Sequence, residues 1–180
     1  MNRLVRTIDT LNDRIGRAVS WLALVLVVVG GWNAIARYLD RETGTVLSSN
    51  FWIEAGWYLF ALLLLFGAAW VLRNDAHVRV DVFYSRLSDR GKAWIDMIGS
   101  FVLLIPFSLL MLWAVWPSVV ESWRISEMSP DPGGLPRWPI RAVVPIAIVL
   151  LMLQGLSNGL KALSLLRGTM PTGEEEERND

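Results

Sequence analysis

Four long stretches without a single charged residue constrain the fold of this chain more than any other feature. They cover residues 18–36, 55–72, 97–120 and 142–160, which is 19, 18, 24 and 19 residues. An α-helix rises about 1.5 Å per residue and the hydrocarbon core of a bilayer is about 30 Å thick, so each stretch is long enough to cross a membrane. We therefore expect an all-α integral membrane protein with a domain of four transmembrane helices over residues 18–165. The expected spans are about 18–38, 52–72, 95–120 and 141–163.

The first 17 residues follow a different pattern. Apolar side chains recur at Leu4, Ile8, Leu11 and Ile15, while arginines and aspartates fill many positions between them. This spacing predicts an amphipathic helix that lies in the membrane interface, with its arginines at anionic headgroups. A plain cytoplasmic extension of the first span is the alternative. Residues 34–36 resemble a signal-peptidase site, but the apolar stretch before them is long for a signal peptide, so we expect no cleavage.

The distribution of basic residues predicts the orientation. Twelve of the 17 lie before the first span, in the segment of residues 73–94, or at and after the end of the fourth span. The other five lie in or directly beside the remaining two connections. Basic residues favour the cytoplasmic side, so we expect both termini and the 73–94 segment to be cytoplasmic. The last 15 residues, 166–180, are rich in glutamate and predict a disordered acidic tail.

Ten tryptophans are many for a chain of this length. Several fall near the ends of the expected spans, where an amphipathic ring is well placed at headgroup depth. We interpret these residues first as interfacial anchors and second as contacts for a partner. They are Trp21, Trp52, Trp57, Trp70, Trp94, Trp113, Trp116 and Trp138.

Few residues could carry catalysis. The chain has no cysteine and one histidine, His77, which shares a short segment with Arg79 and Asp81. One histidine cannot build a haem or di-iron site, and no P-loop, HExxH or G-x-S-x-G motif occurs. We expect a protein that is not an enzyme and has no cofactor or metal site. In an extended segment His77, Arg79 and Asp81 share one side, which favours a structural or partner-contact role in the loop.

The expected spans hold few groups that could guide a solute. Arg37 ends the first span and Glu54 begins the second at similar depth, which predicts an intramembrane ion pair. The remaining polar side chains near the span centres are Ser100, Ser108, Gln154 and Ser157. Gly155 and Gly159 form a small-xxx-small pattern that allows close helix packing. These features indicate a scaffold subunit rather than a self-sufficient transporter.

Three segments resemble one family. The sequences NAIARY, FWIEAGWYLFALLLLFGAAWVLRNDAHVRVDVFYSRLS and SWRISEMSPDPGGLPRWPI are similar to the small membrane subunit, DctQ type, of tripartite ATP-independent periplasmic (TRAP) transporters. The resemblance covers roughly residues 15–165. Its most specific part is a glycine that is followed, ten positions later, by a His-Val-Arg-Val-Asp run. The matching residues here are Gly67, His77, Arg79 and Asp81. We expect Gly67 to be a helix-packing position.

The resemblance implies a role in secondary active uptake at the bacterial inner membrane. In this family a periplasmic binding protein (DctP type) captures an organic acid. A large multi-span permease subunit (DctM type) then moves the solute by an elevator motion driven by a sodium gradient. The small subunit is implied to anchor the large one and to help dock the binding protein. Substrate and sodium ligands then belong to the large subunit.

Two other functions remain open from the sequence. The chain could be a self-contained channel or carrier that oligomerises through Gly155 and Gly159, which would call for a polar stripe along one helix. It could also be the membrane anchor of a redox complex, which would call for haem-binding histidines. The residues present offer neither feature.

Overall fold

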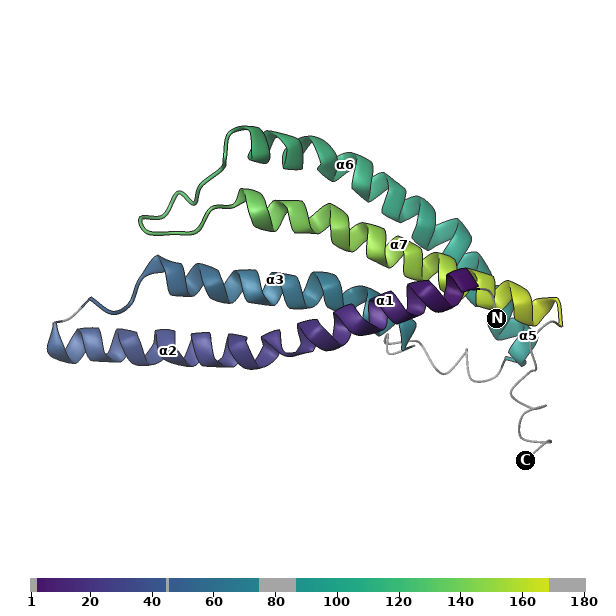
Figure 1. The fold of residues 1–180 in the computed structure, drawn as a ribbon, viewed down its shortest axis with the longest axis horizontal. Helices are drawn as coiled ribbons and strands as arrows, with labels where there is room; N and C mark the ends of the chain where they lie inside the picture. Colours follow the sequence, from purple (N-terminus) through teal and green to yellow (C-terminus); the bar gives the residue numbers. More distant parts are fainter. Residues whose placement is uncertain (1–2, 45, 75–86, 169–180) are drawn as a thin grey trace, which may run out of the picture.

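The structure, a computed structural model, describes residues 3–44, 46–74 and 87–168, which form seven helical elements (Figure 1). Four helical segments are long and apolar enough to cross a membrane, namely 3–43, 50–73, 89–124 and 138–166. The prediction of an all-α chain with four such helices is confirmed. The elements are α1 (Arg3–Ser20), α2 (Leu22–Thr43), α3 (Asn50–Arg73), α5 (Asp89–Ile98), η1 (Gly99–Leu104), α6 (Ile105–Arg124) and α7 (Trp138–Leu166).

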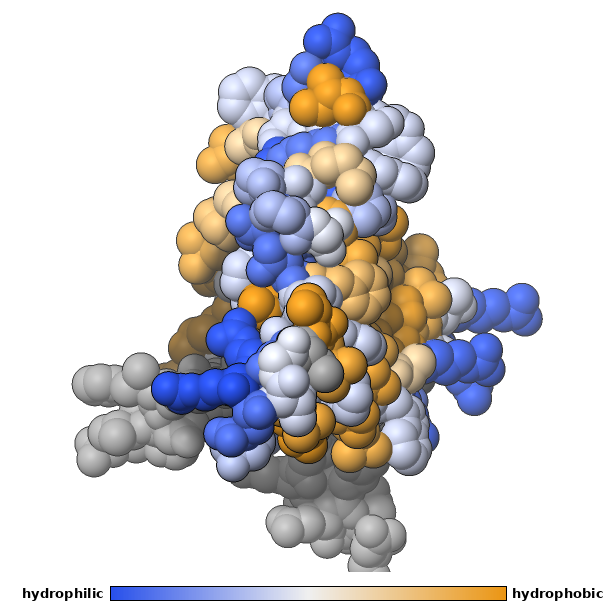
Figure 2. Space-filling model, turned by 90° about the vertical axis from the view of Figure 1, so that its left-hand side faces the viewer, coloured by the Kyte–Doolittle hydropathy of each residue, from blue (hydrophilic) through white to orange (hydrophobic). Residues whose placement is uncertain are grey.

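The four long segments form a single flat layer rather than a closed bundle. Helix α2 packs on α3, α3 on α7, and α7 on α6, so α2 and α6 occupy the two edges (Figure 1). Figure 2 views the layer from one end and shows hydrophobic side chains on both flanks. Large apolar side chains are exposed along every one of these helices, among them Val28, Phe60, Leu110 and Ile146. The layer therefore presents two broad apolar faces.

The two ends of the layer differ. One end, the loop end, carries the connections of residues 44–49 and 125–137. The other, the terminal end, brings together the start of α1 and the last turns of α7 (Figure 1). His77, Arg79 and Asp81 lie outside the described residues, as does most of the predicted acidic tail. The chain is described again from Leu87, and Ser88 caps α5 by accepting a hydrogen bond from the backbone N–H of Gly91 (3.3 Å).

The third membrane-crossing segment changes its helical geometry part-way along. The π-helical turns of η1 join α5 to α6, just before Pro106 near the start of α6. Proline has no amide hydrogen to continue an α-helical ladder, and a local π-helix accommodates such a break. The wider turns place Phe101 and Leu104 directly over Gly159 and Gly155 of α7, where any side chain would collide with them.

The two glycines of the GxxxG pattern therefore lie at a close contact within the chain. A Cβ atom at Gly159 would lie 2.7 Å from the Phe101 ring, and one at Gly155 would lie 2.5 Å from the Leu104 side chain. Gly67 is different, because a Cβ atom built there meets nothing within 4 Å. Gly155 and Gly159 thus lie at a close helix contact within the chain, whereas Gly67 lies at no such contact with the described residues.

Helix α1 is not separate from the other helices. It runs into α2 with only Trp21 between them and crosses α3 and α7 at the terminal end (Figure 1). The side that it buries consists of Val5, Ile8, Asn12 and Gly16. Only Ile8 of the predicted apolar row belongs to this side, and Leu4 and Leu11 are exposed. The face of α1 that packs on the protein is therefore partly polar, and most of the apolar row points away.

Candidate functional site

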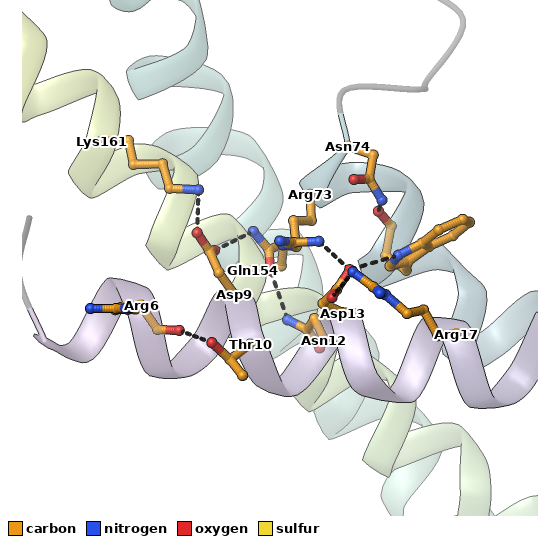
Figure 3. Close-up of polar contacts among 11 residues, drawn as sticks. Arg6, Asp9, Thr10, Asn12, Asp13, Arg17, Arg73, Asn74, Gln154 and Lys161 are labelled. Atoms are coloured by element: carbon orange, nitrogen blue, oxygen red, sulfur yellow. Dashed lines mark hydrogen bonds and ion pairs between the residues drawn. The ribbon is translucent and has the colours of Figure 1, made fainter.

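A cluster of polar side chains holds α1 against α3 and α7 (Figure 3). We call it the polar clamp. The helices cross here at the terminal half of the layer, so side chains distant in sequence meet. The clamp consists of Asp9, Asn12 and Asp13 from α1, Trp70 and Arg73 from α3, and Gln154, Ser157, Asn158 and Lys161 from α7.

Gln154 is the centre of the clamp and is completely buried. Its Oε1 accepts a hydrogen bond from Asn12 Nδ2 (2.8 Å), and its Nε2 donates to Asp9 Oδ1 (3.1 Å) and to Asn158 Oδ1 (3.0 Å). Asn158 in turn donates to the backbone carbonyl of Leu72 in α3 (3.2 Å). A buried amide must find partners for both its donor and its acceptor atoms, and here they come from α1 and from the next turn of α7.

Both carboxylates of the clamp are neutralised. Asp9 lies 2.5 Å from Lys161 Nζ and accepts a hydrogen bond from Ser157 Oγ (2.7 Å). Asp13 is paired with Arg73 of α3 (2.5 Å) and with Arg17 one turn further along α1 (2.7 Å). Each negative charge therefore has a basic partner, which limits the cost of placing it beside apolar helices.

The close approach of α1 to α3 depends on a glycine. Trp70 of α3 lies against Gly16, so that a Cβ atom at this position would overlap the indole. The indole Nε1 also donates to Asp13 Oδ1 (3.4 Å). Of the clamp's buried side-chain polar atoms, Asn12 Oδ1 has no hydrogen-bond partner among the described residues. With its charges paired, the clamp positions a helix, and the described residues that form it present no poised acid, base or nucleophile.

A second polar site lies at the loop end, where α3 holds the proline-rich connection. We call it the loop clasp. Glu54, only 2% exposed, accepts hydrogen bonds from Ser129 Oγ and from the backbone N–H of Leu135 (2.5 Å). One turn further along α3, the Tyr58 hydroxyl donates to the Pro136 carbonyl (2.9 Å). Asn50 donates to the Pro132 carbonyl (3.0 Å), so one face of the first turns of α3 fixes the connection.

The predicted ion pair between Arg37 and Glu54 does not form in this structure. Both carboxylate oxygens of Glu54 are used by Ser129 and Leu135, and Arg37 is exposed on α2. No ion pair of the described residues joins the two side chains. Glu54 bonds instead to a loop about 75 residues later in the chain. The expected ion pair rested on the similar membrane depth of Arg37 and Glu54, and depth alone gives no information about this loop.

The eight tryptophans expected near the span ends divide into two groups. Five are exposed: Trp21, Trp57, Trp94, Trp113 and Trp116. The other three contact the rest of the chain. Trp52 lies edge-on against Trp32 and Phe51, and Trp138 lies edge-on against Trp123. Trp70 belongs to the clamp.

The sequence did not reveal the polar clamp, although three of its members, Gln154, Ser157 and the expected anchor Trp70, had been singled out. Gln154 and Ser157 were isolated polar residues in an apolar span, and Lys161 continues the same helical face. Asp9, Asn12 and Gly16 share one face of α1 at matching spacing. The available signal for the clamp was therefore a pair of partly polar helix faces, one on α1 and one on α7, that carry opposite charges. Among the residues that the structure describes, no cluster of His, Cys, Asp or Glu side chains could hold a metal ion.

Comparison with known proteins agrees with this picture of a helical membrane component. The family model for the DctQ component of tripartite ATP-independent periplasmic transporters matches residues 26–165. No curated protein and no solved structure is significantly similar to the chain. The matched region includes all but the first residues of α2, and it extends through α3 and α6 almost to the end of α7. The chain belongs to the DctQ family, the non-catalytic small membrane component of TRAP transporters.

Proposed function

We propose that this chain is the small permease subunit that anchors the large subunit (DctM type) of a sodium-driven TRAP transporter for organic acids in the bacterial inner membrane. The flat layer of helices is the observation that carries the proposal. A single layer encloses no pathway for a solute, and its two broad faces expose many large apolar side chains that contacts among the described residues leave uncovered. One face can pack on a large membrane partner while the other meets lipid.

A self-contained channel built from copies of the chain is less well supported. Its assembly would use Gly155 and Gly159, but Phe101 and Leu104 of the same chain already cover these glycines. The buried polar side chains of α7, Gln154 and Ser157, are bonded to α1 rather than aligned along an open surface. Transport sites in membrane proteins are usually built from broken helices with free polar groups at the midplane.

The proposed orientation places the terminal end in the cytoplasm and the loop end in the periplasm. Twelve of the 17 basic residues then lie on the cytoplasmic side, as the positive-inside rule favours. Helix α1 would lie at the inner membrane interface. The proline-rich connection, held by Glu54 and Tyr58, would form part of a rigid surface for the periplasmic binding protein (DctP type).

Co-purification tests the anchoring role. The chain, tagged after its acidic tail and extracted from its native membranes in mild detergent, should bring down a large multi-span permease in a fixed ratio. A tagged four-span membrane protein of unrelated sequence serves as the control. If the chain emerged alone, or if cells lacking it kept full uptake, the anchoring role would be ruled out.

A further inference from the structure

Helix α1 presents two different sides to its surroundings in addition to the side that it packs on the protein. Arg3, Arg6 and Arg14 are exposed and share one side at spacings of three, eight and eleven residues, which keep them on one side of a helix. None of these three forms an ion pair with any described residue. Arg17 differs, because it is tied to Asp13. The three arginines form a row of uncompensated charge, which we call the arginine row.

An apolar flank runs beside the arginine row. Leu4 and Leu11 are 53% and 43% exposed, and Ile15 continues their line. Successive residues of an α-helix are about 100° apart around its axis. On this count the apolar flank lies between the arginine row and the side of α1 that is buried on α3 and α7. A helix with adjacent basic and apolar sides suits the boundary between lipid headgroups and acyl chains.

The polar clamp fixes which way the arginine row points. Asp9 and Asn12 are bound to α7, and Asp13 is bound to α3, so α1 cannot turn about its axis without breaking these contacts. Helix α1 also runs into α2, which begins the first apolar span, so in a membrane the row would lie next to its surface. The arginines are thus held in place before any ligand arrives, which lowers the entropic cost of binding.

We propose that α1 is a binding surface for anionic phospholipids. The guanidinium groups of Arg3, Arg6 and Arg14 bind the phosphate-bearing headgroups, since guanidinium matches phosphate oxygens in planar, paired hydrogen bonds. Leu4 and Leu11 contact the upper part of the acyl chains. The lipid would fix the depth of the crossing between α1, α3 and α7.

Lipid retention by the full chain tests the proposal. The purified protein in detergent is titrated with phosphatidylglycerol or with phosphatidylcholine, and bound lipids are counted by native mass spectrometry. The wild type should retain phosphatidylglycerol in preference to phosphatidylcholine. The triple variant R3Q/R6Q/R14Q should lose this preference by roughly tenfold or more, because each basic residue near an anionic surface strengthens binding several-fold.

A matched control separates a specific surface from net charge. The variant R37Q/R41Q/R124Q removes the same charge from exposed arginines near the loop end and should keep the wild-type preference. The arginine row has no ion-pair partner among the described residues, and Arg124 in the control variant forms only an exposed pair with Glu121. Exposed pairs contribute little, so helicity measured by circular dichroism should be unchanged in both variants. Equal retention of phosphatidylglycerol by the wild type and R3Q/R6Q/R14Q, or equal losses in the two triple variants, would overturn the proposal. The experiment needs no partner subunit, so its failure would leave the anchoring role standing.

Discussion

Replacing Gln154 with leucine should release α1 from the rest of the molecule. Leucine has a similar volume but leaves Asn12 without its bonding partner and removes one donor from Asp9, at a position that water does not reach. Each buried polar group left without a partner costs about 1–3 kcal/mol, so the contact should weaken by on the order of 2–4 kcal/mol. A disulfide between α1 and α3 can report this loss, because the chain has no cysteine of its own.

The reporter is the pair G16C/W70C, whose backbones approach closely enough that the indole fills the space at Gly16. W70C removes only the hydrogen bond from Trp70 to Asp13, and the rest of the clamp stays in place. Under mild oxidation the pair should cross-link rapidly when Gln154 is present and several times more slowly when Gln154→Leu is added. The variant N12L/Q154L is the control, since removing both partners leaves fewer unpaired groups than removing one. It should cross-link faster than Gln154→Leu alone. Unchanged cross-linking in Gln154→Leu would show that the clamp does not hold α1.

Removing the carboxylate of Glu54 should free the proline-rich connection at the loop end. Glu54→Ala loses the acceptor for both Ser129 and the Leu135 N–H, whereas Glu54→Gln keeps one acceptor oxygen. Tryptic cleavage at Arg137, in the connection that the clasp fixes, should therefore become faster in the order wild type, Glu54→Gln, Glu54→Ala. We expect the alanine variant to be cut on the order of tenfold faster, because local opening exposes this backbone.

The matched control for Glu54 is Glu121→Gln. It removes one negative charge at the same end of the layer, from a side chain that is 54% exposed and pairs only with Arg124 one turn away. Exposed pairs of this kind contribute little, so cleavage at Arg137 should match the wild type. If Glu121→Gln accelerated cleavage as much as Glu54→Ala, the loss of charge rather than the clasp would explain the effect. The clasp variants should also weaken capture of the binding protein while leaving co-purification of the large subunit intact.

The membrane-spanning helices could be predicted from the sequence because the bilayer imposes a length on every uncharged stretch. The order of the helices across the layer could not, since lipid-facing and partner-facing surfaces are equally apolar and leave no periodic signal. For the same reason the sequence could not show that the helices form an open layer. The glycines of α7 indicated close helix packing, but the π-helical turn that places Phe101 on Gly159 depends on tertiary contacts.

Polar residues in the apolar segments were the weakest part of the sequence interpretation. The similar membrane depth of Glu54 and Arg37 suggested that the two residues form a pair. In the structure, the connection after α6 supplies the hydrogen-bond donors that bind both carboxylate oxygens of Glu54. Gln154 and Ser157 looked isolated because their partners lie some 145 residues earlier, in a helix assigned to the membrane interface. Contacts between residues so far apart in the sequence depend on how α1 crosses α7. The spacing of residues within one helix carries no information about that crossing.

Reconstituted transport is the most direct test of the central claim that this chain supports a transporter without carrying the pathway. Proteoliposomes are prepared with the large subunit, with this chain, or with both, and the binding protein loaded with its own organic acid is added outside. We predict sodium-dependent uptake only when both membrane subunits are present. Uptake by this chain alone, or equal uptake by the large subunit without it, would contradict the account.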